Sequence, residues 1–309
     1  MNCQASRLDL ERFRAAIIQR VGLQFDEARL GFLGEVLQRR LDKLGRSCDA
    51  YLWGLQREPS NDEISVLARE LTVGETYFFR NIEQFRAFAE IALPERMCVD
   101  RTPRTLRLLS AGCASGEEAY SMAIVAREAI ADPSWEILIR GVDLNPAALE
   151  KAKRARYSSW ALREAPLEMQ RKWFRPEGRE VVLDKTVCAA VTFEAANLAS
   201  EDPGLWQPGA YDVIFCRNVL MYFSPEQMRA AIARIAQSLV PGGFLFLGHA
   251  ETLRGISDEF HLRHTHGTFY YERKERAGRA YARTETSIPS PTPSYAPVAP
   301  VSDAWFHSI

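Results

Sequence analysis

The stretch LLSAGCASGEEAYSMAIV, from Leu108 to Val125, decides the fold of this chain. An apolar strand segment runs into a turn of small residues, Ala111 to Gly116, which two glutamates and an apolar helical segment follow. In an open α/β sheet, ligands bind at the carboxyl ends of the strands, where this turn would lie. Because the turn has no bulky side chain, a ligand can approach its backbone closely. The stretch therefore predicts a ligand site.

Apolar segments alternate with helical segments in the part of the chain around this turn. Nearly continuous apolar strands separated by helices indicate a parallel sheet that is covered on both faces. Ser224, with Pro225 at the next position and Gln227 behind it, predicts the start of one helix, and Pro241 predicts its end. The expected strands are residues 105–110, 136–143, 189–197, 211–219 and 242–250, and 261–273 alternates in a way that predicts antiparallel edge strands.

The rest of the chain divides by composition. Helical spacing of Leu33, Leu37 and Leu41, a stop at Gly45 and a capping box from Ser60 to Glu63 indicate an all-α N-terminal domain. Prolines and charges then predict a linker, and a Pro-rich C-terminal stretch is expected to be disordered. The expected domains are residues 1–93 (helical), 94–104 (linker), 105–275 (α/β, with a β-subdomain inserted at 158–190) and 276–309 (tail).

Composition excludes several classes of protein. A net charge of −1 over 309 residues gives no global basic field, so we expect no nucleic-acid partner. Six scattered cysteines without a C-x-x-C pair favour free thiols in a reducing cytoplasm over disulfides or zinc. The charged N-terminus is unlike a signal peptide, and no apolar run is long enough to span a membrane. We expect a cytoplasmic protein that binds no metal and does not insert into membranes.

The charges at the turn restrict the ligand. Glu117 and Glu118 would repel the pyrophosphate of a dinucleotide at this helix N-terminus and attract a cationic group, although they also complement the helix dipole. Asp143 ends the second strand, where a carboxylate suits a ribose diol, or alternatively caps the following helix. A ribose, a sulfonium and an ammonium without a phosphate are the groups of S-adenosylmethionine, which we therefore expect as the cofactor.

A series of motifs in order then resembles the CheR-type chemotaxis receptor methyltransferases. The motifs are ELTVGETYFFRN, SAGCASGEEAYS, VDLNPAALEKAKRARY, DVIFCRNVLMYF and GGFLFLGHAETL, within about residues 8–273. The resemblance implies a small all-α N-terminal domain followed by a Rossmann-like, class I S-adenosylmethionine-dependent methyltransferase domain with a small inserted β-subdomain. It implies an enzyme that esterifies glutamate side chains of chemoreceptor cytoplasmic domains in chemosensory adaptation.

The resemblance also assigns site residues. Arg80 and Tyr222 are expected nearest the transferred methyl group. Gly74 stands where the family often has Asn, so this position is not assigned a contact. The residues expected around S-adenosylmethionine, or its product S-adenosylhomocysteine, are Thr76, Arg80, Glu118, Asp143, Asn197, Leu198, Arg217 and Asn218.

Methyl transfer to a carboxylate needs no general base, because the nucleophile is already ionised at neutral pH. Positioning and electrostatics remain, for which Arg80 provides a fork of donors and Tyr222 a hydroxyl. A structural ion pair of Arg80 and simple packing of Tyr222 are the alternatives. A non-catalytic adaptor that senses S-adenosylmethionine is the alternative function.

The helical domain offers a basic cluster that can steer an acidic receptor helix bundle, or that is merely a solvated face. Its members are Arg29, Arg39, Arg40, Lys43 and Arg46. In some family members the β-subdomain binds a pentapeptide at the receptor C-terminus by strand addition. The loop in FRPEGREVVLDK is short here, so we expect an enzyme that is independent of the pentapeptide.

Overall fold

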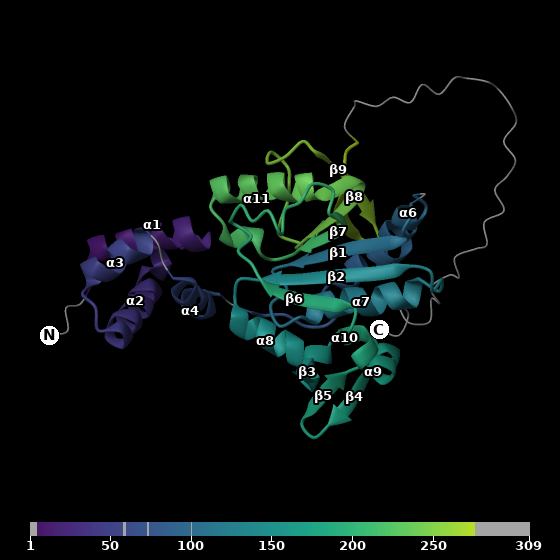
Figure 1. The fold of residues 1–309 in the computed structure, drawn as a ribbon, viewed down its shortest axis with the longest axis horizontal. Helices are drawn as coiled ribbons and strands as arrows, with labels where there is room; N and C mark the ends of the chain where they lie inside the picture. Colours follow the sequence, from purple (N-terminus) through teal and green to yellow (C-terminus); the bar gives the residue numbers. More distant parts are fainter. Residues whose placement is uncertain (1–4, 58–59, 73, 100, 276–309) are drawn as a thin grey trace, which may run out of the picture.

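The structure, a computed structural model, describes residues 5–57, 60–72, 74–99 and 101–275. The expected Pro-rich tail, 276–309, lies outside the described residues. A central sheet is flanked by helices, with a group of N-terminal helices at one end and a small second sheet below it in the view of Figure 1.

The central sheet has seven strands in the order β6-β2-β1-β7-β8-β10-β9. The first five are parallel, and β10 and β9 add an antiparallel hairpin at one edge, as the alternation of 261–273 predicts. The order reverses at β1, which pairs with both β2 and β7, so the switch point lies at the turn after β1. The strands are β1 (Thr105–Ala111), β2 (Glu136–Asp143), β6 (Val191–Ala195), β7 (Tyr211–Cys216), β8 (Leu239–Leu247), β9 (Phe260–Thr265) and β10 (Thr268–Arg273).

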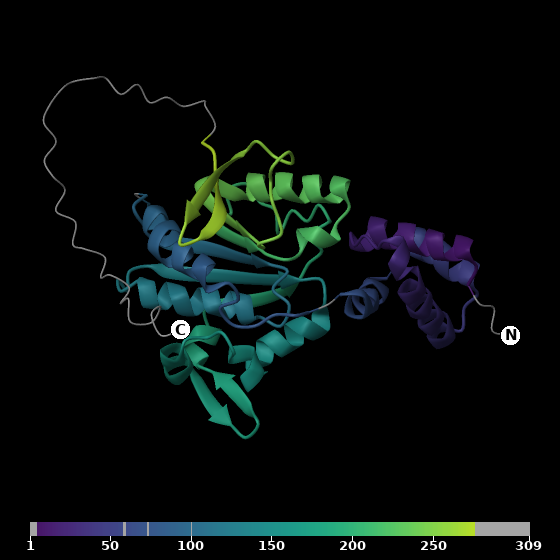
Figure 2. The same cartoon turned by 180° about the vertical axis from the view of Figure 1, so that it is seen from behind.

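Successive strand residues point to opposite faces of the sheet and feed two cores. Leu108 and Phe215 pack with α7 (Glu117–Ala129) and α8 (Pro146–Arg154), whereas Leu109 and Ile214 pack with α11 (Pro225–Ser238). Figures 1 and 2 show α7 and α11 on opposite sides of the sheet. The expected α/β fold, with a parallel sheet covered on both faces, is confirmed.

The end of α11 differs from the prediction. The helix stops at Ser238, and β8 begins at the next residue, so Pro241 lies inside a strand. Leu239 pairs with Tyr211 but Phe244 pairs with Val213, and the irregularity between these pairs takes up the intervening residues. A bulge of this kind removes the need for the backbone N–H that proline lacks.

The N-terminal helical region consists of α1 (Arg7–Val21), α2 (Leu30–Leu44), α3 (Cys48–Arg57) and α4 (Asn61–Leu71), with a short turn η1 (Glu27–Arg29) before α2. Gly45 ends α2 in the left-handed conformation, as predicted. Ser60 caps α4 by accepting from the backbone N–H of Glu63, but the Glu63 side chain does not complete the capping box.

Glu63 instead binds Arg40, which corrects the expectation that Arg40 belongs to an exposed basic cluster. The Arg40 side chain is 4% exposed, its Nε lies 2.9 Å from Glu63 Oε1, and the Tyr51 hydroxyl donates to the same oxygen at 2.7 Å. Burial by itself would raise the pKa of Glu63, but the hydrogen bonds from Arg40 and Tyr51 outweigh it and hold that pKa below its usual value. Arg40 is therefore part of the interior of the helical region.

The helical segment after the motif ELTVGETYFFRN (residues 70–81) packs against the sheet. α5 (Ile82–Ala87), the π-helical turn η2 (Phe88–Ala92) and α6 (Leu93–Met97) follow one another without a break, so the expected linker begins inside a helix. Pro94 is tolerated because it stands at the start of α6. Phe85 and Phe88 contact Phe215 at ring centroid distances of 5.4 and 5.5 Å. We therefore propose that the boundary of the helical domain lies before Ile82, not at residue 93.

The segment expected as an inserted β-subdomain holds a three-stranded antiparallel sheet in the order β3-β5-β4. The hairpin lies between β4 and β5, and the KTVC part of the expected hairpin is helical, because Asp184 caps it by accepting from the backbone N–H of Thr186. The elements are β3 (Arg156–Ser158), η3 (Ser159–Leu162), α9 (Leu167–Trp173), β4 (Phe174–Glu177), β5 (Glu180–Leu183) and α10 (Lys185–Cys188).

Candidate functional site

A single pocket collects the site residues that the sequence predicts. It lies at the carboxyl ends of β1, β2, β6 and β7. Its wall is completed by the segment 74–80 before α5 and by residues from the N-terminal helical region. The predicted residues that line it are Thr76, Arg80, Glu118, Asp143, Asn197, Leu198, Arg217, Asn218 and Tyr222. Gly74 lines the same pocket.

The turn after β1 forms one wall of this pocket. Gly112 has φ 81°, and a Cβ built there would lie 2.3 Å from a methyl carbon of Val219, so the position requires glycine. The backbone N–H groups of Gly112 and Cys113 both donate to the Val142 carbonyl, which fixes the turn against the end of β2. At Gly112 the small residue is thus required by the contact with Val219, while Gly112 and Ala114 both line the pocket.

Asp143 connects the two strand ends. Its Oδ2 accepts from the backbone N–H of Ala114 at 2.8 Å and its Oδ1 from that of Asn145 at 2.8 Å. The helix α8 is capped by Asn145 rather than by Asp143, which resolves one of the alternatives. Burial raises the pKa of Asp143, although the backbone hydrogen bonds oppose that rise. Each oxygen keeps a second lone pair, so the carboxylate can still accept hydrogen bonds from a ligand.

The two glutamates at the start of α7 have different surroundings. Glu118 lines the pocket and accepts from the Ser110 hydroxyl at 2.7 Å. Glu117 is bonded to the Ser115 hydroxyl at 2.8 Å and does not line the pocket. Burial raises the pKa of both carboxyl groups. Only Glu118 is therefore placed to face a cationic group of a ligand.

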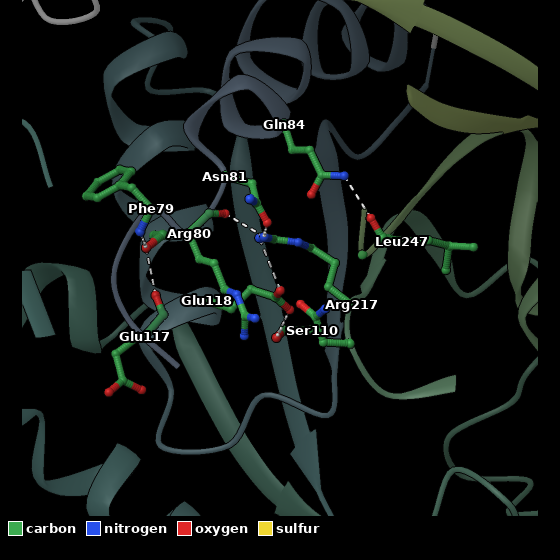
Figure 3. A network of polar contacts seen from close by, with 12 residues as sticks. Phe79, Arg80, Asn81, Gln84, Ser110, Glu117, Glu118, Arg217 and Leu247 are labelled. Atoms are coloured by element: carbon green, nitrogen blue, oxygen red, sulfur yellow. Dashed lines mark hydrogen bonds and ion pairs between the residues drawn. The ribbon is translucent and has the colours of Figure 1, made fainter. Parts of the chain in front are cut away.

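Arg217 lines the pocket, and its guanidinium bonds to protein groups (Figure 3). Its Nη2 donates to the Arg80 carbonyl and, at 2.7 Å, to Asn81 Oδ1, while its Nη1 lies 3.5 Å from Glu118 Oε2. Phe79, whose N–H donates to the Ser121 hydroxyl, and Asn81 have φ values of 57° and 59°. These contacts hold a strained backbone on both sides of Arg80.

The guanidinium of Arg80 uses only part of its N–H donors for the contacts that the described residues show. Its Nη1 donates to the Glu75 carbonyl at 3.0 Å, and its guanidinium carbon lies 5.6 Å from the centre of the Tyr77 ring. Within the described residues no carboxylate forms an ion pair with Arg80, so the structural ion pair considered as its alternative is not seen. Tyr222 lines the same pocket with 37% of its surface exposed.

The helical region is attached at the rim of the pocket. Leu23 forms a β-bridge with Phe223, and the N–H of Gln24 donates to the Tyr222 carbonyl at 2.7 Å. Asn197 donates to the Arg20 carbonyl at 3.0 Å, so its amide connects α1 to the loop after β6. Asn197 and Leu198 thus line the pocket, and the amide of Asn197 anchors the helical region.

Several residues that line the pocket were not predicted from the sequence. Gln24 and Arg29 belong to the helical region, where the only signal was the basic character of Arg29. Asn145 lines the pocket beside Asp143, and its presence in the same motif was the available signal. For metals, the described part of the chain has no group of three or more His, Cys, Asp or Glu side chains that is suited to bind an ion.

Comparison with protein families gives the identity of this fold and pocket. The family described as CheR methyltransferase, SAM binding domain, matches residues 74–269. The chain belongs to the CheR methyltransferase family. Its similarity extends to the N-terminal helices, since chemotaxis protein methyltransferase 2 of Vibrio cholerae is 32% identical over 85% of this chain and 92% of its own length. A chemotaxis protein methyltransferase of Klebsiella aerogenes is 32% identical over 82% of this chain and 86% of its own.

Among solved structures, the chain resembles magnesium protoporphyrin IX methyltransferase from Synechocystis with bound SAM, at 15% identity and a TM-score of 0.36. The similarity covers 70% of this chain and 97% of that one. The sheet order found here, with its antiparallel β10-β9 hairpin, is that of the class I methyltransferase fold expected from the sequence.

S-adenosylmethionine is the cofactor of this family, and the pocket fits it. Two buried carboxyl groups, Asp143 and Glu118, face the pocket, and burial raises the pKa of each, so a ligand with hydroxyl and cationic groups compensates their charge. The backbone turn at Gly112 and Ala114 borders the pocket, and among the described residues that line it there is no lysine for a phosphate. No helix in the described ranges combines the length and the apolar composition that crossing a bilayer requires.

Proposed function

We propose that this CheR methyltransferase transfers a methyl group from S-adenosylmethionine to glutamate side chains of chemoreceptor cytoplasmic domains. The observation that supports this most directly is the guanidinium of Arg80, which uses one N–H for the Glu75 carbonyl and turns toward the pocket that contains Asp143 and Glu118. A cation beside a methyl-donor site selects an anionic acceptor. The V. cholerae and K. aerogenes relatives are named chemotaxis protein methyltransferases, which supports a chemotaxis substrate.

The bound cofactor supplies an electrophilic methyl group on its sulfonium. Arg80 holds the acceptor carboxylate through the remaining donors of its fork, which fixes the direction of attack. Tyr222 lines the same pocket, and its hydroxyl orients the acceptor oxygen. No side chain has to remove a proton, because the attacking carboxylate is ionised at neutral pH. The residues therefore act by position and charge, and Asp143 and Glu118 orient the cofactor.

The adaptor alternative requires a pocket that binds cofactor but lacks an acceptor site. The partly uncommitted Arg80 and the exposed Tyr222 in the same pocket are arguments against it. For the receptor, the short turn at Gly178 and Arg179 between β4 and β5 supports the proposal that docking is independent of a C-terminal pentapeptide. The exposed members of the basic cluster remain candidates for contact with the receptor: Arg29, Arg39, Lys43 and Arg46.

A labelled-methyl assay tests the function. The protein is incubated with methyl-labelled S-adenosylmethionine and a purified receptor cytoplasmic fragment, and the product is treated with mild base. A glutamate methyl ester releases labelled methanol, whereas an N-methyl group is stable. A receptor fragment in which the candidate glutamates are replaced by alanine serves as the control. Base-stable label, or no transfer despite tight binding of S-adenosylhomocysteine, would contradict the proposal.

A further inference from the structure

Residues 217–222 follow β7, and we name them the β7 loop. This loop contributes Arg217, Asn218 and Tyr222 to the pocket, and its backbone surrounds a carboxylate from another loop. Glu251 lies between β8 and β9 and is half-buried. Its Oε2 accepts from the N–H groups of Asn218 at 2.8 Å and Gly248 at 2.7 Å. Its Oε1 accepts from two further N–H groups of the β7 loop.

These two further donors are Val219, at 3.0 Å, and Met221, at 3.2 Å. Three of the four amides that bind Glu251 therefore belong to residues 218–221, a loop about thirty positions earlier in the chain. Successive N–H groups that converge on one anion form a backbone nest, and a buried or half-buried carboxylate stabilises it more than a neutral acceptor does. Glu251 thus determines the conformation of that loop.

The loop is not in a relaxed conformation by itself. Asn218 has φ 58°, in the left-handed region that costs free energy for a residue with a side chain. Such a conformation persists only where the surroundings hold it, and the N–H of Asn218 is held by Glu251. The following turn η4 (Leu220–Tyr222) brings Tyr222 to the pocket.

The approach of the two loops is close enough to restrict the sequence. A Cβ built on Gly248 would lie 2.8 Å from Glu251 Oε2, 2.8 Å from Asn218 Nδ2 and 2.9 Å from the Asn218 backbone nitrogen. Gly248 is therefore needed for the loops after β7 and β8 to meet. Gly248 and Glu251 therefore form one structural unit with the β7 loop.

We propose that Glu251 is a positioning residue of the methyltransferase. It keeps the β7 loop in the conformation that presents Arg217, Asn218 and Tyr222 to the cofactor pocket. Among the described residues that line that pocket, Glu251 is absent, so it acts through the loop and not by touching the ligand. The inference concerns the cofactor pocket, so it holds whatever the methyl acceptor proves to be.

Replacing Glu251 by glutamine tests this. Glu251→Gln keeps the shape of the side chain but removes its charge. Its NH₂ group is a donor and would face backbone N–H groups that need an acceptor. Glu259→Gln is the matched control, because Glu259 is an exposed glutamate of the same β8–β9 loop. The readouts are calorimetric affinity for S-adenosylhomocysteine, hydrogen exchange of residues 217–222 followed by mass spectrometry, and thermal unfolding.

For Glu251→Gln we expect affinity to fall at least tenfold and exchange of the β7 loop to accelerate, while exchange of the sheet core stays as in the parent. Saturating S-adenosylhomocysteine should slow the loop exchange again, because the ligand favours the ordered loop. A purely structural role would instead raise exchange across the whole chain in proportion to lost stability.

If Glu251→Gln does not fold, Glu251→Asp carries the same test, since its shorter side chain keeps the charge but cannot reach all four amides. Parent-like affinity and parent-like loop exchange in the folded variant would overturn the proposal. Uniformly faster exchange with unchanged affinity would overturn it as well.

Discussion

Asp143 is where the structure allows the sharpest test of the cofactor site. The proposed change is Asp143→Asn, which preserves the shape of the side chain and removes its charge. The two oxygens each accept one backbone N–H, so each has one lone pair left for the ribose hydroxyls. Hydrogen bonds to a charged group contribute about 1.5–3 kcal/mol, which corresponds to roughly ten- to hundredfold in affinity for S-adenosylhomocysteine.

The expected effect on stability is much smaller than the effect on affinity. Burial raises the pKa of Asp143, which means that the ionised carboxylate is less favourable in the folded protein than in the unfolded chain. Neutral asparagine removes that cost, while its NH₂ group loses one of the two backbone hydrogen bonds. These changes oppose each other, so thermal unfolding should move by only a few degrees.

The control is Asp132→Asn. Asp132 lies in the loop before β2, outside the pocket, and accepts from the N–H of Ser134 at 2.9 Å. Asp143 accepts from the N–H of Asn145 in the same way, two residues further along the chain. Calorimetry should give parent affinity for this control. Because burial raises the pKa of Asp143, the affinity of the parent for S-adenosylhomocysteine should begin to fall, as the pH is lowered, at a higher pH than the pKa of an ordinary aspartate would give. Asp143→Asn should not show this loss of affinity. Equal dissociation constants for Asp143→Asn and the parent at neutral pH would refute the ribose contact.

Three further outcomes are expected. Arg80→Ala should slow single-turnover methyl transfer far more than it weakens S-adenosylhomocysteine binding, and a parent-like rate would show that Arg80 is structural. Arg40→Ala should lower the free energy of unfolding in urea by about 3 kcal/mol, because it leaves the carboxylate of Glu63 buried without its cation; an unchanged midpoint would contradict this. Lys43→Glu combined with Arg46→Glu should raise the KM for receptor at low salt and much less at high salt, since exposed charges are screened within about 8 Å at physiological ionic strength. Equal KM values at both salt concentrations would show that this face is only solvated.

The sequence determined the sheet and the position of the pocket. The apolar segment 211–219 contains β7, whose residues are all buried, because a parallel strand covered on both faces is apolar along nearly its whole length. The small residues around Gly112 indicated the ligand turn, and the motifs named the residues that line the pocket. These features depend on residues close together in the chain, where periodicity and turn chemistry act directly.

Tertiary structure decided the partners of charged side chains. Arg40 resembles an exposed helix arginine in the sequence, yet Glu63 and Tyr51 enclose it, because α2, α3 and α4 bring them together. Pro94 resembles the start of a linker, yet it stands in the first turn of α6, where proline is tolerated, and the preceding turn packs Phe88 against Phe215 of the sheet.

The β7 loop depends most strongly on contacts between distant segments. Nothing local to Asn218 requires a left-handed backbone, and its cost is offset by a carboxylate that the chain supplies 33 residues later. A charged side chain at an exposed loop position has many possible partners in the sequence and one in the fold. Only the approach of the loops after β7 and β8, which Gly248 permits, selects Glu251 for that role.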